Sequence, residues 1–493
     1  LFWTFLFVFG LILAGIGMYL FLRSIGISVP AALIASVSYM FAGNLVSTTF
    51  AGHEGRLLAM AYFPLAFFCW HKGISTHKFY WFVFAGGVAG FSFLHGHFQL
   101  TYYGLWVAFA YFIVQLVLNR HENTARTTLK LIGFAVMSVL VALGILAVNY
   151  LPFLGNLTSG ARGETRGYEF AASWSLPLKE LFDLIVPQFS GILDNYWGEN
   201  FFKLHTEYFG IVLLIAAILG LVIKVRERKT LFFLITSIIV TLTALGGHTP
   251  FFKLIYYLLP GVKRFRGPSM AFYLAAFSII VLGAIGIQYL LDYNQQKKNL
   301  DPNIKKRLKN WVYVITVIFI IVFITFLIIK SNADSFIKDP VKVKAFMNNI
   351  SHFWSGILIS VIIAFVSTIL FYRLATQKLK ITNFIILIIP IICFDLWRVN
   401  SKFLRTVDHP NVYYAPDEVV NFLRKDTTQY RVHPLYDGMF GLRVQYEHSN
   451  DGLLDLYNIQ NVGGYCPNPL QTYQDFIGAE NKLTKILLAL KKQ

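Results

Sequence analysis

The chain carries long apolar stretches along most of its length, for example residues 1–22, 131–151, 270–291 and 311–329. Each is long enough to cross about 30 Å of hydrocarbon as an α-helix, which takes roughly 17 to 25 residues. Because the stretches are continuously apolar, unlike the alternating strands of a barrel, helices are the expected spanning element. The series therefore predicts an α-helical polytopic membrane protein.

Composition and charge agree with a membrane protein. Of 493 residues, 56% are hydrophobic and only 14% are charged. Soluble globular proteins have fewer hydrophobic and more charged residues than this. The net charge of +18 comes mostly from loops beside apolar stretches, where cations set orientation and meet lipid headgroups, so we expect no nucleic-acid partner. The cysteines Cys69, Cys393 and Cys466 form neither a disulfide framework nor a metal-binding spacing.

We expect about 11 to 12 transmembrane helices. If all candidates cross, every strongly basic loop falls on one side, which the positive-inside rule identifies as the cytoplasm. The candidate spans are 1–22, 30–47, 56–71, 79–94, 98–118, 131–151, 209–223, 231–247, 269–291, 311–329, 353–372 and 381–397.

The same orientation places five segments outside: 48–55, 95–97, 152–208, 248–268 and the tail from 399. Residues 330–352 should also lie outside, and their lysines among apolar residues suggest an interfacial segment.

We predict two domains, a transmembrane domain over 1–397 that includes the outer segment 152–208, and a soluble extracytoplasmic region over 398–493. We predict that the soluble region contains both helices and strands, as an α+β fold. Its predicted elements are a helix opened by Pro416, Asp417 and Glu418 and running to Leu423, a strand over 430–433 and a helix over 472–490.

The first group of candidate site residues enters the third span from the outside. It comprises His53, Glu54 and Arg56, flanked by Gly52 and Gly55. An imidazole, a carboxylate and a guanidinium at a membrane surface can bind a phosphate, a metal ion or a sugar hydroxyl. Solvated residues at a helix start, with Glu54 near the positive end of the dipole, are the simpler interpretation.

The second group lies at the next outer turn, where His95, His97 and Gln99 precede Tyr102 and Tyr103. His95 and Gln99 are four positions apart, so in a helix they share a face and can point into the bundle. A His-x-His pair is a weak metal signal by itself. An interfacial histidine with satisfied hydrogen bonds is an equal alternative to a substrate contact.

The third group is Lys263, Arg264 and Arg266, on the side where loop cations are otherwise sparse. Arginine can fork onto phosphate oxygens and lysine can add a point charge, so an anionic partner is expected. Headgroup anchoring, with Phe265 as an interfacial aromatic residue, is the alternative.

The long outer segment mixes carboxylates with aromatic residues, a combination that suits carbohydrates but is also common in interfacial loops. Glu207 and Tyr208, at the mouth of a span, are its main candidates. The others are Arg162, Glu164, Arg166, Asp183, Asp194, Glu199 and His205, with Trp174, Tyr196 and Trp197 between them.

Several short passages resemble the YfhO-like family of bacterial membrane proteins, within the class of polytopic glycosyltransferases that use polyprenyl-phosphate sugars. The passages are AGHEGRLLAMAYFPL (51–65), HFQLTYY (97–103), EYFG (207–210), KRFRGP (263–268), and parts of the tail around 430–432 and 463–467. They occur in the family's order along nearly the whole chain. A resemblance of this kind supports an inference about the fold more strongly than one about the substrate.

The resemblance implies transfer of a sugar from a polyprenyl-phosphate donor to a cell-envelope glycan or lipid acceptor, in the bacterial cytoplasmic membrane. The donor phosphate would meet Lys263, Arg264 and Arg266. Further expected substrate contacts are Arg56, His95, His97, Gln99, Glu207 and Tyr208.

The class usually takes its catalytic base from an Asp in the first outer loop. We expect that loop to precede residue 1, so that the chain is part of a longer protein, which leaves Glu54 and His53 as catalytic candidates. Cofactor use, including that of a divalent metal, is left open. A flippase for lipid-linked glycans and a non-catalytic scaffold are the alternatives. A flippase is disfavoured because the spans hold few ionisable residues apart from Asp395.

Overall fold

The computed structural model describes residues 2–159, 167–296, 302–406, 408–432, 453–461 and 470–473. Helices make up most of this described part, in which nine are long and apolar enough to cross a membrane. The helical part of the sequence prediction is confirmed, and the chain has the architecture of a multi-pass membrane protein.

Each predicted span coincides with a helix or a pair of consecutive helices. Most are longer than predicted, whereas α5, α9 and α10 are short for a span. The helices are α1 (Phe2–Ser24), α2 (Val29–Met40) with α3 (Gly43–Val46), α4 (Glu54–Thr76), α5 (Phe79–Leu94), α6 (Phe98–Leu118), α7 (Ala125–Ser159), α9 (Ile211–Lys224), α10 (Arg228–Ala244), α12 (Phe272–Gln295), α13 (Pro302–Ser331), α15 (Pro340–Ala375) and α16 (Ile381–Asn400).

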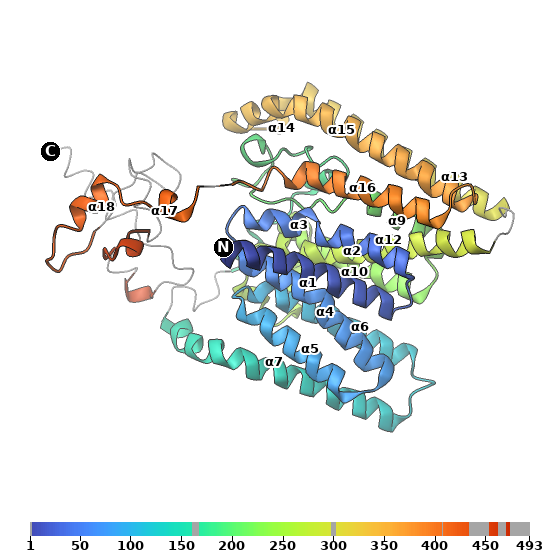
Figure 1. Cartoon of the computed structure of the whole chain (residues 1–493), viewed down its shortest axis with the longest axis horizontal. Coiled ribbons are helices and arrows are strands. Elements are labelled where there is room, and N and C mark those ends of the chain that lie inside the picture. The colour runs from blue at the N-terminus through green and yellow to red at the C-terminus, as the bar shows by residue number, and fades with distance from the viewer. Residues whose placement is uncertain are drawn as a thin grey trace. The chain divides into compact units, whose positions relative to one another are not determined.

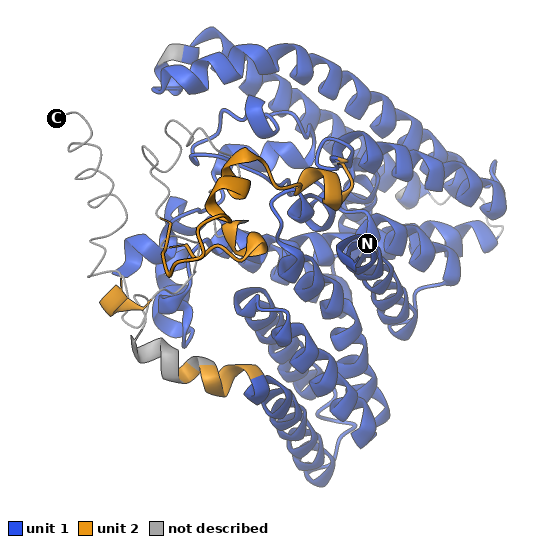
Figure 2. Cartoon of the chain, turned by 60° about the vertical axis from the view of Figure 1, so that its left-hand side comes forward, with its two compact units in different colours: residues 1–148, 167–405 blue, residues 149–166, 406–493 orange. Residues whose placement is uncertain are grey.

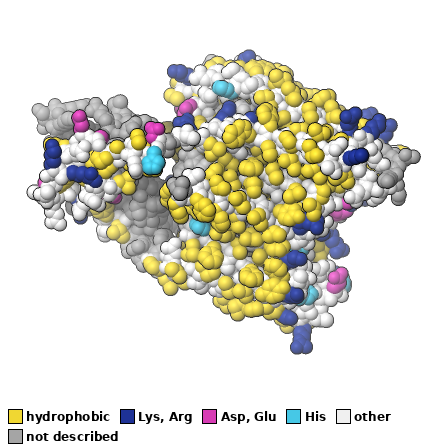
Figure 3. Space-filling model, viewed as in Figure 1, with side chains coloured by type: hydrophobic (Ala, Val, Ile, Leu, Met, Phe, Trp, Pro, Cys, Tyr) yellow, Lys and Arg dark blue, Asp and Glu magenta, His cyan; other side chains and the backbone are white. Residues whose placement is uncertain are grey.

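The long helices lie side by side with their axes roughly aligned (Figure 1). Hydrogen bonds tie the predicted basic side of the bundle together: Lys229 Nζ donates to the Ile25 carbonyl and Arg307 to the Ile223 carbonyl, both at 2.8 Å. Lysines and arginines gather at the end of the bundle where α12 meets α13, beside a broad apolar belt (Figure 3). We call the opposite end the outer end.

Helix α12 forms the centre of the bundle and is buried along most of its length. It approaches α9 closely because both carry small residues where they cross. A β-carbon at Gly286 would lie 2.2 Å from the Ala216 carbonyl oxygen, and one at Gly220 would lie 2.6 Å from that of Leu282. Close backbone approach of this kind is typical of helix packing in membranes, where dispersion contacts replace the hydrophobic effect.

A second apolar core lies at the outer end, beyond the length of a membrane span. Helix α15 has 36 residues, about 54 Å at 1.5 Å per residue, so it extends past a bilayer core. Its first turns and the end of α13 pack on the segment that follows η2 (Leu178–Leu184), through Phe189, Trp197, Phe326 and Phe353. The predicted interfacial segment 330–352 is therefore largely helix ends that cover this core.

The chain divides into two compact units, residues 1–148 with 167–405, and residues 149–166 with 406–493 (Figure 2). The second unit contains α17 (Pro410–Tyr413), α18 (Glu418–Leu423) and η8 (Leu453–Tyr457). The predicted helix ending at Leu423 is confirmed, and the Asp417 side chain caps it by accepting a hydrogen bond from the Val420 amide at 2.9 Å.

The α+β prediction for this unit is not supported by its described residues. The strand predicted over 430–433 appears there only as one isolated parallel bridge between Val432 and Asn461. Most of the helix predicted over 472–490, and the family-like passage at 463–467, lie outside the described residues.

Candidate functional site

The first two groups of candidate residues meet at the outer end of the bundle. Gly55, in the first turn of α4, packs so closely on the α5–α6 turn that a β-carbon there would lie 2.3 Å from the His95 carbonyl oxygen. The His95 ring in turn stacks on Tyr62 of α4, with centroids 5.5 Å apart and an interplanar angle of 18°. His53 and His97 precede α4 and α6 respectively.

Arg56 occupies the centre of this junction with part of its hydrogen-bonding capacity unused. One terminal nitrogen lies 3.4 Å from His53 Nδ1. Its buried Nε has no hydrogen-bond partner among the described residues, and neither has the buried Nδ1 of His97. Buried polar atoms are normally satisfied, so two unsatisfied nitrogens in one junction suggest that a polar ligand completes them.

The two histidines beside Arg56 favour their neutral forms. Loss of hydration, followed by the positive charge of Arg56, lowers the pKa of His53 to about 4 and that of His97 to about 3. Burial also lowers the pKa of His95. At neutral pH the junction therefore holds one fixed cation and several uncharged imidazoles, which can accept as well as donate hydrogen bonds.

Glu207 extends this junction, since its charge acts on Arg56. Its carboxylate pairs with Lys203 Nζ at 2.6 Å and with His205 Nε2 at 3.1 Å. Burial alone would raise the pKa of Glu207, but Lys203 and His205 outweigh it and hold that pKa well below its usual range. Glu207 is therefore a fixed negative charge within the site.

Lys203 connects Glu207 to a buried polar core inside the long outer segment. Its ammonium also lies 2.6 Å from Glu180 and 3.7 Å from Asp183. Burial disfavours the charged form of Lys203, but the three carboxylates hold its pKa well above the usual range. For Asp183 burial is the largest effect, and it raises the pKa to about 7 against the opposing influence of Lys203.

Tyr208 points into a different buried cluster. Its hydroxyl donates to both carboxylate oxygens of Asp395, at 2.7 and 2.8 Å, and the Ile211 amide donates to the same carboxylate at 2.9 Å. Arg398 pairs with Asp395 at 3.0 Å and donates to Ser360 at 3.0 Å. This cluster fixes the start of α9 against α16, so Tyr208, predicted as a substrate contact, is engaged within the protein.

Gln99 contacts the segment that carries the third group of candidate residues. Gln99 is buried and its side-chain amide donates to the Gly267 carbonyl at 3.4 Å. Lys263, Arg264 and Arg266 are exposed. The Lys263 ammonium lies over Tyr257, and the Arg266 guanidinium lies 5.9 Å from the centre of the Phe170 ring. The three cations thus form an open, solvated surface.

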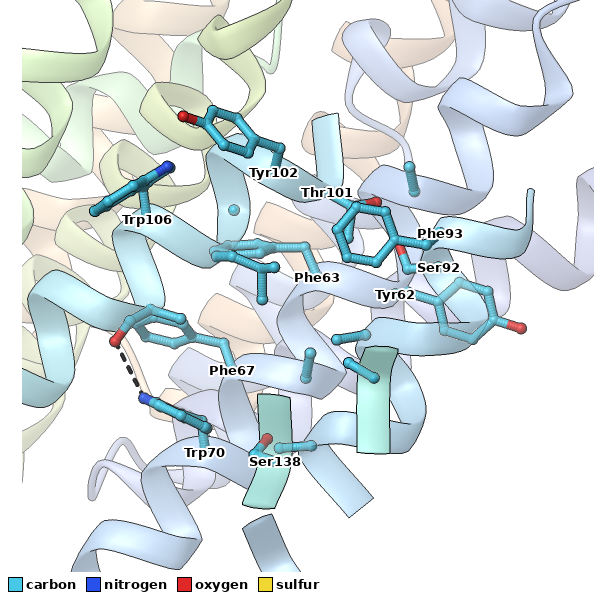
Figure 4. A pocket seen from close by; sticks show the side chains of 18 of the residues that line it. Tyr62, Phe63, Phe67, Trp70, Ser92, Phe93, Thr101, Tyr102, Trp106 and Ser138 are labelled. Carbon is cyan, nitrogen blue, oxygen red and sulfur yellow. Dashed lines mark hydrogen bonds between the residues drawn. The ribbon is translucent and has the colours of Figure 1, made fainter. Parts of the chain in front are cut away.

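An apolar groove runs between α4, α5, α6 and α7 (Figure 4). Its cavity is about 510 Å³ and its wall is almost entirely aromatic and aliphatic, with Tyr62, Phe63 and Trp106 among the larger side chains. The hydroxyls of Ser92 and Thr101, 2.8 Å apart, bond to each other. Ala59, which lines the groove, follows Arg56 by three residues on α4, so the groove begins about one helical turn from the Arg56 junction.

Glu54 begins α4, where the helix dipole favours a carboxylate. Its side chain makes no ion pair or hydrogen bond within the described residues. In that part of the chain no three His, Cys, Asp or Glu side chains converge as metal ligands.

Among the residues of the site, Lys203 and Arg398 were not singled out from the sequence, whereas His205 and Glu207 were. Lys203, His205 and Glu207 alternate in the chain, and an extended segment places such residues on one side. That spacing was a usable signal. Arg398, one turn after Asp395, was another. The electrostatic influence of Glu207 on Arg56 acts between residues 151 positions apart in the chain, so it has no local signature in the sequence.

Comparison with known proteins adds no relative: no family model, no curated protein and no solved structure matches the chain.

Proposed function

We propose that the protein is a membrane glycosyltransferase that moves a sugar from a polyprenyl-phosphate carrier to an acceptor outside the cytoplasm, in a bacterial cytoplasmic membrane. The observation that carries the proposal is the position of the unsatisfied Arg56 and His97 about one turn above an apolar groove. An anionic head joined to a long apolar tail fits that combination.

The groove suits the tail of the donor because its wall offers almost no polar contact. Isoprenoid units would gain dispersion contacts with Phe63, Trp106 and their neighbours. The outer face of the groove is formed by residues that are half exposed, such as Phe109 and Leu143. A lipid could therefore enter sideways from the bilayer.

The phosphate would meet Arg56, whose unused Nε lies in the same plane as two terminal nitrogens, one of them already near His53. The exposed Lys263, Arg264 and Arg266 would attract the anionic donor at the surface before it reaches the junction. Glu207 beside Arg56 would orient the guanidinium and balance its charge once the phosphate leaves.

The reaction requires one base and one stabilised leaving group. An acceptor hydroxyl would attack the anomeric carbon, the bond from that carbon to the phosphate oxygen would break, and polyprenyl phosphate would depart beside Arg56. The hydroxyl proton would pass to His53 or Glu54, both at the rim of the junction and therefore open to an acceptor from outside. A divalent cation is not required by this scheme.

The test is incubation of the full-length protein in lipid nanodiscs with radiolabelled polyprenyl-phosphate sugars and a membrane-derived acceptor fraction. We expect the label to move from the polyprenyl-phosphate sugar to a different product in the acceptor fraction. Arg56→Ala should abolish this transfer and Arg56→Lys should restore only part of it, because lysine keeps the charge and loses the fork. Movement of intact donor between leaflets without sugar release would instead establish a flippase.

A further inference from the structure

A small polar cavity lies away from the Arg56 junction, between the outer segment and α15. It measures about 150 Å³ and is lined by Gln188, Asp194, Asn349, His352 and Lys402 among others. A cavity of roughly this size holds one six-membered ring. It is too small for a lipid and lies outside the groove described above.

The floor of the cavity contains a buried side chain without a partner. Gln188 is 6% exposed, and its Oε1 has no hydrogen-bond partner among the described residues. Beside it, Asn349 is 1% exposed and is held in place because its Nδ2 donates to the Gln188 carbonyl at 2.7 Å. A buried amide oxygen without a hydrogen bond destabilises the folded protein, and a hydroxyl group bound in the cavity would supply the missing donor.

The rim carries charges of both signs. Asp194, His352 and Lys402 are all exposed, and none of their side chains has a hydrogen bond or ion pair within the described part of the chain. Leu193, also in the wall, has a φ of 52°, a conformation that non-glycine residues adopt rarely. The chain is thus turned sharply at the point where Asp194 reaches the rim.

We infer that this cavity binds one sugar unit through its hydroxyl groups. Each sugar hydroxyl both donates and accepts, which matches amides on the floor and a carboxylate, an imidazole and an ammonium at the rim. A simple anion would be repelled by Asp194 and a simple cation by Lys402. Its role as the subsite for the acceptor sugar rests on the proposed function, whereas sugar binding itself does not.

The cavity is also connected to the charged core of the proposed site. Asp183, which lies beside Lys203, accepts hydrogen bonds from both the amide and the hydroxyl of Ser190. Ser190 follows Gln188 by two residues, so the loop that forms the floor is anchored to the Lys203 core. An acceptor held here would lie on the same outer segment that supplies Glu207.

The experiment uses saturation-transfer NMR to measure glycoside binding to the full-length protein in nanodiscs. The ligands are the methyl glycosides of glucose, galactose, N-acetylglucosamine and glucuronic acid. We expect saturable, millimolar binding of at least one glycoside. Asp194→Asn and Lys402→Met should each weaken it about tenfold or more. The matched surface changes Asp408→Asn and Lys344→Met should leave it unchanged.

Two outcomes would overturn the inference: no glycoside binds, or the Asp194 and Lys402 variants bind as the unchanged protein does. Binding of inorganic phosphate at Asp194 and Lys402 without binding of any glycoside would make the cavity an anion site and would also overturn the inference. The proposed transfer activity is judged separately through Arg56→Ala, which should keep glycoside binding. Glycoside binding without any transfer would therefore leave this inference intact while refuting the proposed function.

Discussion

The α-carbon of Gly55 packs directly against the carbonyl oxygen of His95. The contact leaves room only for a hydrogen atom, because a β-carbon on Gly55 would lie 2.3 Å from that oxygen. The contact sets the first turn of α4 against the α5–α6 turn. It therefore determines how Arg56, the next residue, faces His97.

Replacing Gly55 with Ala should separate these two turns, because the carbonyl belongs to the backbone and cannot rotate aside as a side chain would. Overpacking of this kind costs about 1 to 3 kcal/mol. We expect a lower thermal unfolding midpoint and a larger proportional loss of sugar transfer. Gly87→Ala is the control, since nothing lies within 4 Å of a β-carbon there. Equal behaviour of the two variants would contradict the assigned contact.

The bundle could be predicted from the sequence because apolar runs of span length have few alternative structures in a membrane. The predicted grouping of the basic loops followed from counting crossings, and the hydrogen bonds from Lys229 and Arg307 across neighbouring loops agree with it. Helix ends were less predictable. Helices α13 and α15 continue beyond the bilayer thickness because the outer segment offers Phe189 and Trp197 as an apolar surface to cover.

The candidate site was predicted only in pieces. His53, Arg56, His95 and His97 were recognised as polar residues at helix starts and turns, a local pattern. Their meeting depends on the packing of α4 against α5 and α6, which no spacing encodes. Tyr208 was expected to touch substrate, but its partner Asp395 lies 187 positions away.

The Tyr208–Asp395–Arg398 cluster should contribute mainly to stability. Tyr208→Phe removes a hydrogen bond to a charged group and should cost about 1.5 to 3 kcal/mol. Asp395→Ala should cost more, about 3 to 5 kcal/mol, because it leaves Arg398 without its ion-pair partner in a buried position. Thermal unfolding in nanodiscs measures both. Tyr257→Phe, at an exposed ring, is the control, and a similar small loss in all three variants would refute the assignment.

Asp183 should make stability depend on pH. Its pKa rises from 3.8 to about 7 on folding, so the folded protein binds this proton more tightly than the unfolded chain does. The contribution of Asp183 to the free energy of unfolding is then largest below about pH 4 and declines as pH rises towards 7. Asp183→Asn, which cannot ionise, should lose this decline, so the variant should gain stability relative to the unchanged protein between pH 5 and pH 8.

Unfolding midpoints at pH 5, 6, 7 and 8 measure this difference, with the exposed Asp408→Asn as control. Glu207 does not interfere, because its lowered pKa keeps it ionised throughout that range. A constant difference between Asp183→Asn and the unchanged protein would show that Asp183 is ionised at all four values.

The groove makes a prediction about donor affinity. Ala142 lines it and is 7% exposed, so Ala142→Phe should fill part of the space proposed for the isoprenoid tail. We expect the KM for the lipid donor to rise about tenfold, equivalent to about 1.4 kcal/mol. Val136→Phe on the same helix, at a side chain 53% exposed, adds similar bulk without lining the groove. Equal KM values for the two variants would exclude the groove as the tail site.

Substitutions at the exposed cations Lys263, Arg264 and Arg266 distinguish two roles: attraction of the anionic donor to the protein surface, and direct contact with its bound phosphate. If they contact the bound phosphate, Arg264→Ala or Arg266→Ala should cost about 1.5 to 3 kcal/mol, roughly ten- to a hundredfold in donor affinity or turnover, with incomplete rescue by lysine. Their solvent exposure instead favours attraction, for which each loss should lower kcat/KM only severalfold, increasingly so at low salt, with full rescue by lysine.

Arg56→Ala provides the reference for direct contact, because that guanidinium has an unsatisfied buried nitrogen. We therefore expect its effect to exceed those at 264 and 266 and to persist at high salt. The measurement is kcat/KM for the lipid donor at 50 and 500 mM salt, at matched protein levels in nanodiscs. A salt-independent loss at Arg264 or Arg266 with little effect at Arg56 would move the phosphate site from the junction to the surface loop.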